Sequence, residues 1–221
     1  MQADRGTGRF IQTLDSLDSM SPAAILLHGP TSAGKSSLAQ ALQDCAPVPA
    51  FHVSLDAFVT MSRRRDMRSA EEIDEAHRVH CENLKSTLAR LAKTPFEIIF
   101  DTVLRQEAEL DDCLRVLSVR PLYEIHVFAP VEILEQRERL RVDRADGMAR
   151  EQASHPIFRR TYDLSIDSSV LSPTQAAEAV RALMSTQPKS NNALQRTASP
   201  SAELDRYASE PASIEQASES A

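Results

Sequence analysis

Short apolar runs alternate with longer amphipathic stretches between Ser21 and Ser185. Nearly continuous apolar runs suit strands that are covered on both faces of a sheet, and several of the five short segments below have this character. We expect strands at Ala23–His28, Phe51–Asp56, Phe96–Asp101, Tyr123–Ala129 and Leu164–Asp167. We expect helices between and after them, at Lys35–Cys45, about Ala70–Lys93, Gln106–Leu117, Val131–Arg139 and from Pro173 onward, with Ser172 as N-cap. The alternation predicts an α/β fold in which right-handed βαβ units build a parallel sheet.

The two ends of the chain lack this pattern. Residues 186–221 are rich in Ser, Ala, Gln, Asn and Glu without a periodic apolar face, so we expect a disordered, low-complexity tail. Residues 1–20 form a polar leader, in which Phe10, Ile11, Leu14 and Leu17 have a spacing that allows a short helix. The sequence therefore predicts a single folded domain at residues 21–185.

Composition and charge narrow the class of protein. The 221 residues contain 25 Lys and Arg against 32 Asp and Glu, which gives a net charge of −7. This acidity argues against nucleic acid and anionic membranes as partners, because their phosphates attract positive surfaces. The apolar run Ala23–Leu27 is too short for a signal segment or a membrane span. The three cysteines form no C-x-x-C pair, so neither a disulfide framework nor a zinc ribbon is supported, and we expect a cytoplasmic protein.

The strongest chemical signal is a complete G-x-x-x-x-G-K-[ST] motif. It follows an apolar strand and opens a predicted helix, which is the context that this motif requires. Backbone N–H groups of such a loop cradle phosphates, its lysine reaches the β- and γ-phosphates, and its last hydroxyl can bind Mg²⁺. The sequence thus predicts a nucleoside triphosphate site formed by Gly29, Pro30, Thr31, Ser32, Ala33, Gly34, Lys35, Ser36 and Ser37.

The second and third predicted strands both end in an aspartate, Asp56 and Asp101 respectively. Ligands of open α/β sheets bind at the carboxyl ends of the strands, so both carboxylates are expected beside the phosphate loop. One of them can hold Mg²⁺, and the other can take a proton from an attacking hydroxyl. The structural alternative for each is a turn or cap residue.

An arginine-rich segment follows the fourth predicted strand. Arg137, Arg141 and Arg144 have the spacing i, i+4 and i+7, which places them on one face of a helix, and Gly147 comes three residues later. Glu135, Glu138 and Asp143 are interleaved, which also suits a solvated, salt-bridged helix. The presence of the phosphate loop favours an arginine lid that closes on phosphates.

These residues resemble those of the chloramphenicol phosphotransferase family, P-loop kinases that transfer the ATP γ-phosphate to a small-molecule hydroxyl. The resemblance spans about residues 23–183, and its most specific part runs from Arg137 to Ala153. It implies a nucleotide-kinase-like fold with a five-stranded parallel sheet, helices on both faces and a helical arginine lid. It also implies that Asp56 is the general base and that Arg141 and Arg144 act on the phosphates. Adenine would lie near the loop that follows Asp167, around Ser168.

We therefore predict an ATP- and Mg²⁺-dependent kinase whose acceptor is a small molecule with a hydroxyl group, chloramphenicol-like by resemblance. The residues expected to act in catalysis are Lys35, Asp56, Arg141 and Arg144. Beyond the loop, Arg137, Asp167 and Ser168 are expected to hold the nucleotide, and Ser36 and Asp101 to hold Mg²⁺.

Two other functions stay open at this point. The basic cluster Arg63–Arg68 would suit a polynucleotide or sugar-nucleotide kinase, as a clamp for an anionic acceptor. A nucleotide-binding regulatory module without an acceptor would need neither the strand-end aspartates nor the lid.

Three histidines and a cysteine complete the candidate chemistry. His77 and His80 lie i, i+3 on a predicted helix, with Cys81 beside them, a spacing that permits a metal pair. No third or fourth ligand is evident in the sequence, so a surface or packed pair is the expectation. His28, directly before Gly29, is expected to be a hydrogen-bonded structural histidine.

Overall fold

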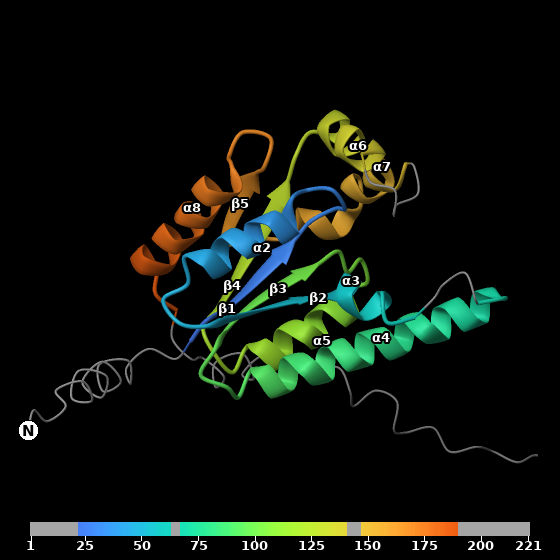
Figure 1. The fold of residues 1–221 in the computed structure, drawn as a ribbon, viewed down its shortest axis with the longest axis horizontal. Helices are drawn as coiled ribbons and strands as arrows, with labels where there is room; N and C mark the ends of the chain where they lie inside the picture. The colour runs from blue at the N-terminus through green and yellow to red at the C-terminus, as the bar shows by residue number, and fades with distance from the viewer. Residues whose placement is uncertain (1–21, 63–66, 141–146, 190–221) are drawn as a thin grey trace, which may run out of the picture.

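A five-stranded parallel sheet forms the centre of the computed structural model, which describes residues 22–62, 67–140 and 147–189 (Figure 1). The strand order is β2-β3-β1-β4-β5, and every neighbouring pair is parallel. The predicted parallel α/β architecture is therefore confirmed. The strands are β1 (Ala24–His28), β2 (Ala50–Ser54), β3 (Glu97–Thr102), β4 (Leu122–Phe128) and β5 (Leu164–Asp167).

Helices cover both faces of the sheet (Figure 1). α2 (Lys35–Asp44) and α8 (Pro173–Thr186) pack together on one face, and α4 (Ala70–Leu91) and α5 (Glu107–Leu117) pack together on the other. α6 (Val131–Arg139) and α7 (Met148–Ala153) form a pair beyond the end toward which β4 points. The short elements are α3 (Leu55–Val59) and a 3₁₀ helix at Pro156–Arg159.

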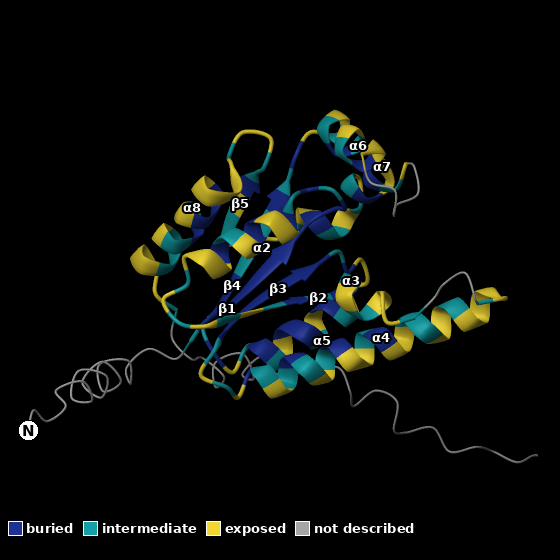
Figure 2. Ribbon diagram, viewed as in Figure 1, coloured by how far each residue is buried: buried dark blue, intermediate teal, exposed yellow. Residues whose placement is uncertain are grey.

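The central strand β1 shows why its sequence is continuously apolar. Ile25 and Leu27 belong to the core cluster under α2 and α8, whereas Ala24 and Leu26 belong to the cluster under α4 and α5. Side chains alternate between the two faces of a strand, so a strand with helices on both sides needs apolar residues at every position. Figure 2 accordingly shows this strand buried along its length.

Local capping sets two boundaries near the carboxyl edge of the sheet. The second strand ends at Ser54 rather than at Asp56, because the Ser54 hydroxyl accepts a hydrogen bond from the Asp56 N–H and starts α3. The expectation that Asp56 ends a strand was therefore wrong, since it lies in the first turn of that helix. The N-cap expected at Ser172 is confirmed, and Gln175 completes a capping box.

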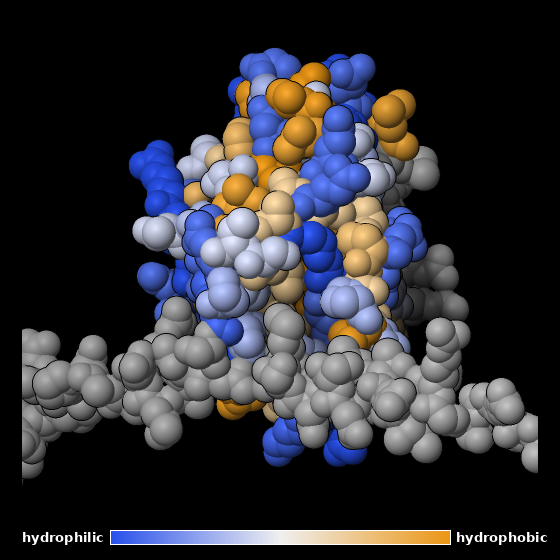
Figure 3. All heavy atoms as spheres, turned by 90° about the vertical axis from the view of Figure 1, so that its left-hand side faces the viewer, coloured by the Kyte–Doolittle hydropathy of each residue, from blue (hydrophilic) through white to orange (hydrophobic). Residues whose placement is uncertain are grey.

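The exposed surface mixes polar and apolar residues. Figure 3 views the side where α8 lies and shows hydrophilic and hydrophobic residues interspersed, with hydrophobic ones toward the top. Large exposed apolar side chains, such as Met61, Leu140 and Val170, belong to separate segments, which is ordinary for protein surfaces. Within the described ranges, no helix combines the length and the apolar character that crossing a bilayer requires.

Several sequence predictions fall outside the described residues. They are the polar leader at 1–20, the part of the predicted tail beyond Lys189, the arginines Arg63, Arg64 and Arg65, and the arginines Arg141 and Arg144.

Candidate active site

The loop between β1 and α2 has the unusual backbone that phosphate binding requires. Gly34 has a φ of +86° and Ser32 a φ of +61°, both in the left-handed region. Among the described residues, Ser32 is the only non-glycine residue with positive φ. Such a conformation costs free energy and is retained mainly at functional sites. The turn is therefore shaped for a ligand rather than for the lowest backbone energy.

Gly29 lets the loop leave β1 close to the backbone of β4. A Cβ atom at this position would lie 2.0 Å from the carbonyl oxygen of Val127. The neighbouring atom is backbone and cannot rotate away, so a side chain here would push two central strands apart.

Replacing Gly29 with alanine is expected to destabilise the protein by roughly 3 kcal/mol or more, because the clash falls in the packed centre of the sheet. Gly147 provides a matched comparison, since it also has a φ of +86° but nothing within 4 Å of its Cβ position. Gly147→Ala should therefore lower the free energy of unfolding by only about 1 kcal/mol, the cost of placing alanine in the left-handed backbone conformation. Urea unfolding of both variants measures the difference, and an equal loss in the two would contradict the close-approach argument.

Two hydroxyl groups of the loop are buried without a hydrogen-bond partner, Thr31 Oγ1 and Ser32 Oγ. A buried unpaired polar group costs about 1–3 kcal/mol, so a ligand with acceptor oxygens fits here. Nearby, the Lys35 ammonium donates to the Pro30 carbonyl across the loop, at 2.8 Å. The loop thus presents hydroxyl groups and a positive charge around one small space, which fits a phosphate group.

Asp101 lies at the end of β3, beside the start of α2. Its Oδ2 accepts hydrogen bonds from the Ser36 hydroxyl at 2.7 Å and from His52 Nε2 at 3.3 Å. Burial alone would raise the pKa of Asp101, but these two donors and the charge of Lys35 outweigh it and hold that pKa below its ordinary value. The carboxylate is therefore ionised, and a hydroxyl oxygen with an anionic carboxylate is a donor set that suits Mg²⁺.

A cavity of about 380 Å³ joins these groups at the carboxyl edge of the sheet. It brings Asp56 and Asp101 together with the phosphate loop, as the strand ends predicted, and it also receives Arg137 and Ser168. Its lining consists of Thr31, Ser32, Gly34, Lys35, Ser36, Ser37, Leu38, Ser54, Leu55, Asp56, Asp101, Thr102, Val103, Val127, Arg137, Ile166, Ser168, Leu171, Pro173 and Ala176.

Not every predicted site residue lines this cavity. Gly29, Pro30 and Ala33 belong to the loop but are absent from the lining, and so is Asp167. The Asp167 carboxylate instead accepts hydrogen bonds from the backbone and hydroxyl of Ser169, at 2.9 and 2.6 Å. Asp167 therefore shapes the turn after β5 and does not face the cavity.

Comparison with known proteins identifies the family. A family model described as chloramphenicol phosphotransferase-like protein matches residues 23–185. The chain belongs to this family. The match confirms the resemblance seen in the sequence and covers almost all of the described fold. A comparison with curated proteins found no match.

Solved structures share the fold of this family member. The APS kinase of Mycobacterium tuberculosis, in complex with AMPPNP and APS, has a TM-score of 0.55 at 15% identity, covering 75% of this chain and 99% of that one. The tunicamycin resistance protein of Deinococcus radiodurans has a TM-score of 0.55 at 18% identity, covering 73% and 94%. Shikimate kinase from Acinetobacter baumannii has a TM-score of 0.53 at 16% identity, covering 79% and 99%. The fold is that of P-loop kinases.

In this member of the family, Arg137 connects two sides of the cavity. Its guanidinium donates to the Ser168 hydroxyl at 2.9 Å and to the Ser168 carbonyl at 2.8 Å. It also reaches the Ser32 carbonyl at 3.3 Å. Arg137 therefore ties the phosphate loop to the turn after β5, which is where the family resemblance places adenine.

Sequence reasoning missed three supporting residues. His52 donates to Asp101, and Gln152 accepts a hydrogen bond from the Thr31 N–H at 2.7 Å. Glu138 is buried and accepts hydrogen bonds from the N–H groups of Gly147 at 3.0 Å and Ala149 at 2.8 Å. Gln152 and Glu138 lie within the most family-specific segment of the sequence, and this position was the one signal that could have drawn attention to them. No spacing rule indicated their hydrogen-bond partners.

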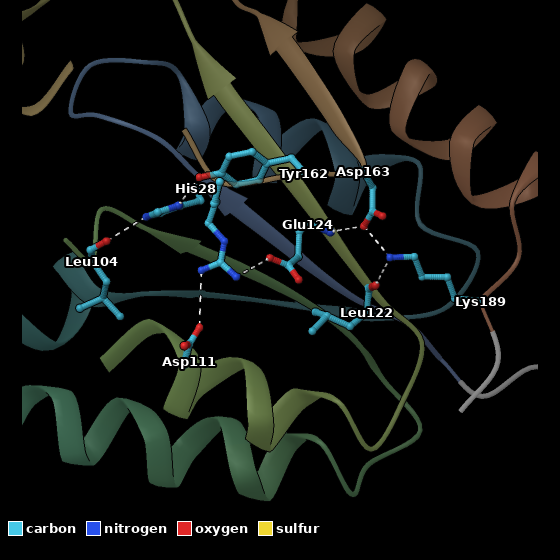
Figure 4. Close-up of polar contacts among 9 residues, drawn as sticks. His28, Leu104, Asp111, Leu122, Glu124, Tyr162, Asp163 and Lys189 are labelled. Carbon is cyan, nitrogen blue, oxygen red and sulfur yellow. Dashed lines mark hydrogen bonds and ion pairs between the residues drawn. The ribbon is translucent and has the colours of Figure 1, made fainter. Parts of the chain in front are cut away.

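The residue before the phosphate loop is held by a neutral hydrogen-bond network (Figure 4). His28 Nε2 donates to the Leu104 carbonyl at 2.9 Å, so its Nδ1 accepts from the Tyr162 hydroxyl, at 2.7 Å. Burial lowers the pKa of His28 to about 3, so the ring is uncharged at neutral pH. The expectation of a hydrogen-bonded structural histidine is confirmed, and this histidine fixes the point where β1 becomes the loop.

Stability should fall below neutral pH because of His28. The unfolded chain takes up a proton near the ordinary pKa of 6.5, whereas the folded protein resists it until about 3. Folding is therefore opposed as the pH falls, by about 2 kcal/mol between pH 7 and pH 5 for this one group. Urea unfolding at both pH values should show a loss that is smaller in His28→Gln by about this amount, because burial also lowers the pKa of His126, which both proteins retain. Equal pH dependence in the two proteins would contradict the assignment.

Proposed function

We propose that the protein is an ATP- and Mg²⁺-dependent kinase that phosphorylates a hydroxyl group of a small molecule. The observation that carries the proposal is the single cavity in which the phosphate loop, Asp56 and Asp101 meet. Family membership and the P-loop kinase fold support it. The cytoplasmic location expected from the cysteines remains part of this proposal.

The nucleotide would bind along one side of the cavity. The loop N–H groups and Lys35 would hold its β- and γ-phosphates. The apolar lining around Leu171 and Ala176, together with Ser168, offers a surface for the base. Arg137 positions this surface relative to the loop through its contacts with Ser32 and Ser168. On the sequence resemblance alone, Arg141 and Arg144 would add charge to the phosphates.

Ser36 and Asp101 are the residues that would hold Mg²⁺, because their oxygens already lie together at 2.7 Å. The ion supplies positive charge that neutralises the phosphates when it is bound. His52, in β2, also contacts the Asp101 carboxylate, at 3.3 Å, and holds its orientation. The arrangement of Ser36 and Asp101 therefore does not depend on a bound ligand.

Asp56 would act as the general base. Its carboxylate takes the proton of the acceptor hydroxyl while the oxygen bonds to the γ-phosphorus, and the bond to the bridging oxygen of ADP breaks. The Asp56 N–H donates a hydrogen bond to the Ser54 hydroxyl at 3.1 Å. This contact positions Asp56 in the first turn of α3. Most of the rate would come from positioning and from charge stabilisation.

A second cavity of about 370 Å³ is the proposed acceptor site. Leu55 and Val103 line both cavities, so the second one begins next to Asp56. Apart from Leu104, its other lining residues are polar or charged, which suits a small molecule with several hydrogen-bonding groups. They are His77, Arg105, Gln106, Glu109, Gln152 and His155.

An ADP-release assay with a panel of acceptors tests the proposal. The panel contains chloramphenicol, other small hydroxylated molecules and a short oligonucleotide with a free 5′-hydroxyl. We expect ADP release that depends on a small-molecule acceptor, with a phosphorylated product of matching mass. Slow ATP hydrolysis that no acceptor accelerates would favour a regulatory module. Phosphorylation of the oligonucleotide alone would favour a polynucleotide kinase.

A further inference from the structure

Three potential metal ligands converge between α4 and α5. His77 Nε2 lies 3.5 Å from Cys81 Sγ and 3.8 Å from Glu109 Oε1, and all three atoms lie within 4.8 Å of one another. His77 and Cys81 have the i, i+4 spacing that places two side chains on one face of a helix. The third group, which the sequence did not reveal, comes from the neighbouring helix.

We propose that His77, Cys81 and Glu109 form a binding site for Zn²⁺. A nitrogen, a thiolate sulfur and a carboxylate oxygen are the ligand types that zinc takes in proteins. With Zn–N of about 2.0 Å and Zn–S of about 2.3 Å, tetrahedral geometry separates the two ligand atoms by about 3.5 Å. The observed separation of His77 and Cys81 has this value, and the carboxylate needs only a small side-chain adjustment.

The two helices are held in the register that the site needs. About one helical turn beyond Cys81 and Glu109, Lys85 of α4 pairs with Asp112 of α5 at 3.2 Å. Buried Leu84 and Leu110 belong to the same core cluster beneath the helices. The ligand-bearing faces are therefore placed by packing, and binding would not have to assemble them.

The geometry of the cluster suits a cation. The Nε2 atom of His77 faces both the Cys81 sulfur and the Glu109 carboxylate, so one ion placed among them would contact all three groups. Zinc would replace the thiol proton and bind all three groups at once.

The neighbouring histidine His80 is not one of the proposed ligands. It is buried, and its Nε2 lies within hydrogen-bonding distance of the Ser62 hydroxyl, at 2.8 Å. His77 and Glu109 line the second cavity, together with His155. The fourth position of the ion is thus open to water or to a molecule in that cavity, an arrangement found in zinc sites with three protein ligands. The metal site does not rest on the proposed kinase activity.

Cobalt titration of the full chain, freed of metal by chelation, tests the site. Co²⁺ occupies zinc sites and reports a thiolate ligand through a sulfur-to-metal charge-transfer band in the near ultraviolet. We expect one equivalent of Co²⁺ to produce this band and Zn²⁺ to remove it. Cys81→Ser should abolish the band, and His77→Ala and Glu109→Gln should each weaken Zn²⁺ binding at least tenfold.

Cys45→Ser is the matched control, because it removes an exposed thiol distant from the cluster in sequence and should leave the band unchanged. Circular dichroism checks that every variant is folded, and Glu109→Gln, at a partly exposed position, keeps the test valid if Cys81→Ser unfolds. The proposal is overturned if the native chain shows no stoichiometric band. It is equally overturned if the band survives in Cys81→Ser or if folded Glu109→Gln binds Zn²⁺ as tightly as the native chain.

Discussion

Lys35→Ala is expected to abolish phosphoryl transfer by removing nucleotide binding. The Lys35 side chain is buried at the start of α2, and its ammonium lies within the phosphate loop, 2.8 Å from the Pro30 carbonyl. The hydroxyl groups of the loop are uncharged, so they cannot replace the positive charge of Lys35 in binding phosphate. The loss should appear both as absent turnover and as absent ATP binding in calorimetry with magnesium present.

Two further variants make this result specific. Lys93→Ala removes a lysine exposed just beyond α4 and should leave both measurements unchanged. Lys35→Met keeps the aliphatic bulk, so a loss of binding in this variant separates the charge from the packing. Native ATP affinity in Lys35→Ala would refute the role of this lysine in phosphate binding.

Asp56→Asn should lower turnover by about 10²–10⁴-fold while leaving ATP affinity close to native. The amide has the shape of the carboxylate but cannot accept the proton of the acceptor hydroxyl. Asp56 lines the cavity from α3, on the side that leads to the second cavity, so its loss should affect the chemical step. Single-turnover kinetics at saturating ATP measure that step directly.

Asp44→Asn is the matched control, since Asp44 is exposed at the far end of α2. Normal turnover in Asp56→Asn would show that another group takes the proton. Loss of ATP binding in that variant would instead place Asp56 in nucleotide binding and not in proton transfer.

The elements of the fold were predictable because each depends on a local pattern. The alternation of short strand-like segments with amphipathic stretches indicated all five strands, and Ser172 and Pro173 correctly indicated the start of α8. The end of β2 was predicted two residues too late. The Ser54 side chain caps the backbone of Asp56, and a short polar capping contact is not visible in an apolar run.

Contacts between distant segments could not be predicted in this way. The partners Thr31 and Gln152 lie 121 positions apart, and no periodicity connects them. The same holds for His77 and Glu109, which meet because α4 packs on α5. The motif predicted the phosphate loop, whereas its support from Gln152, Arg137 and His52 depends on tertiary packing.

The strand order has a consequence for how such a protein can diversify. The chain leaves β1 toward β3 and β2 on one side and later fills β4 and β5 on the other, so a crevice opens at the carboxyl end of β1 whatever the loops contain. The position of the phosphate loop is thereby set by the topology, while residues that follow β2 and β3 line much of the second cavity. Under the proposed function, exchanging cavity-lining side chains such as Arg105 and Gln106 would change the acceptor preference and would leave the strand order and the contact of His28 with the Leu104 carbonyl in place.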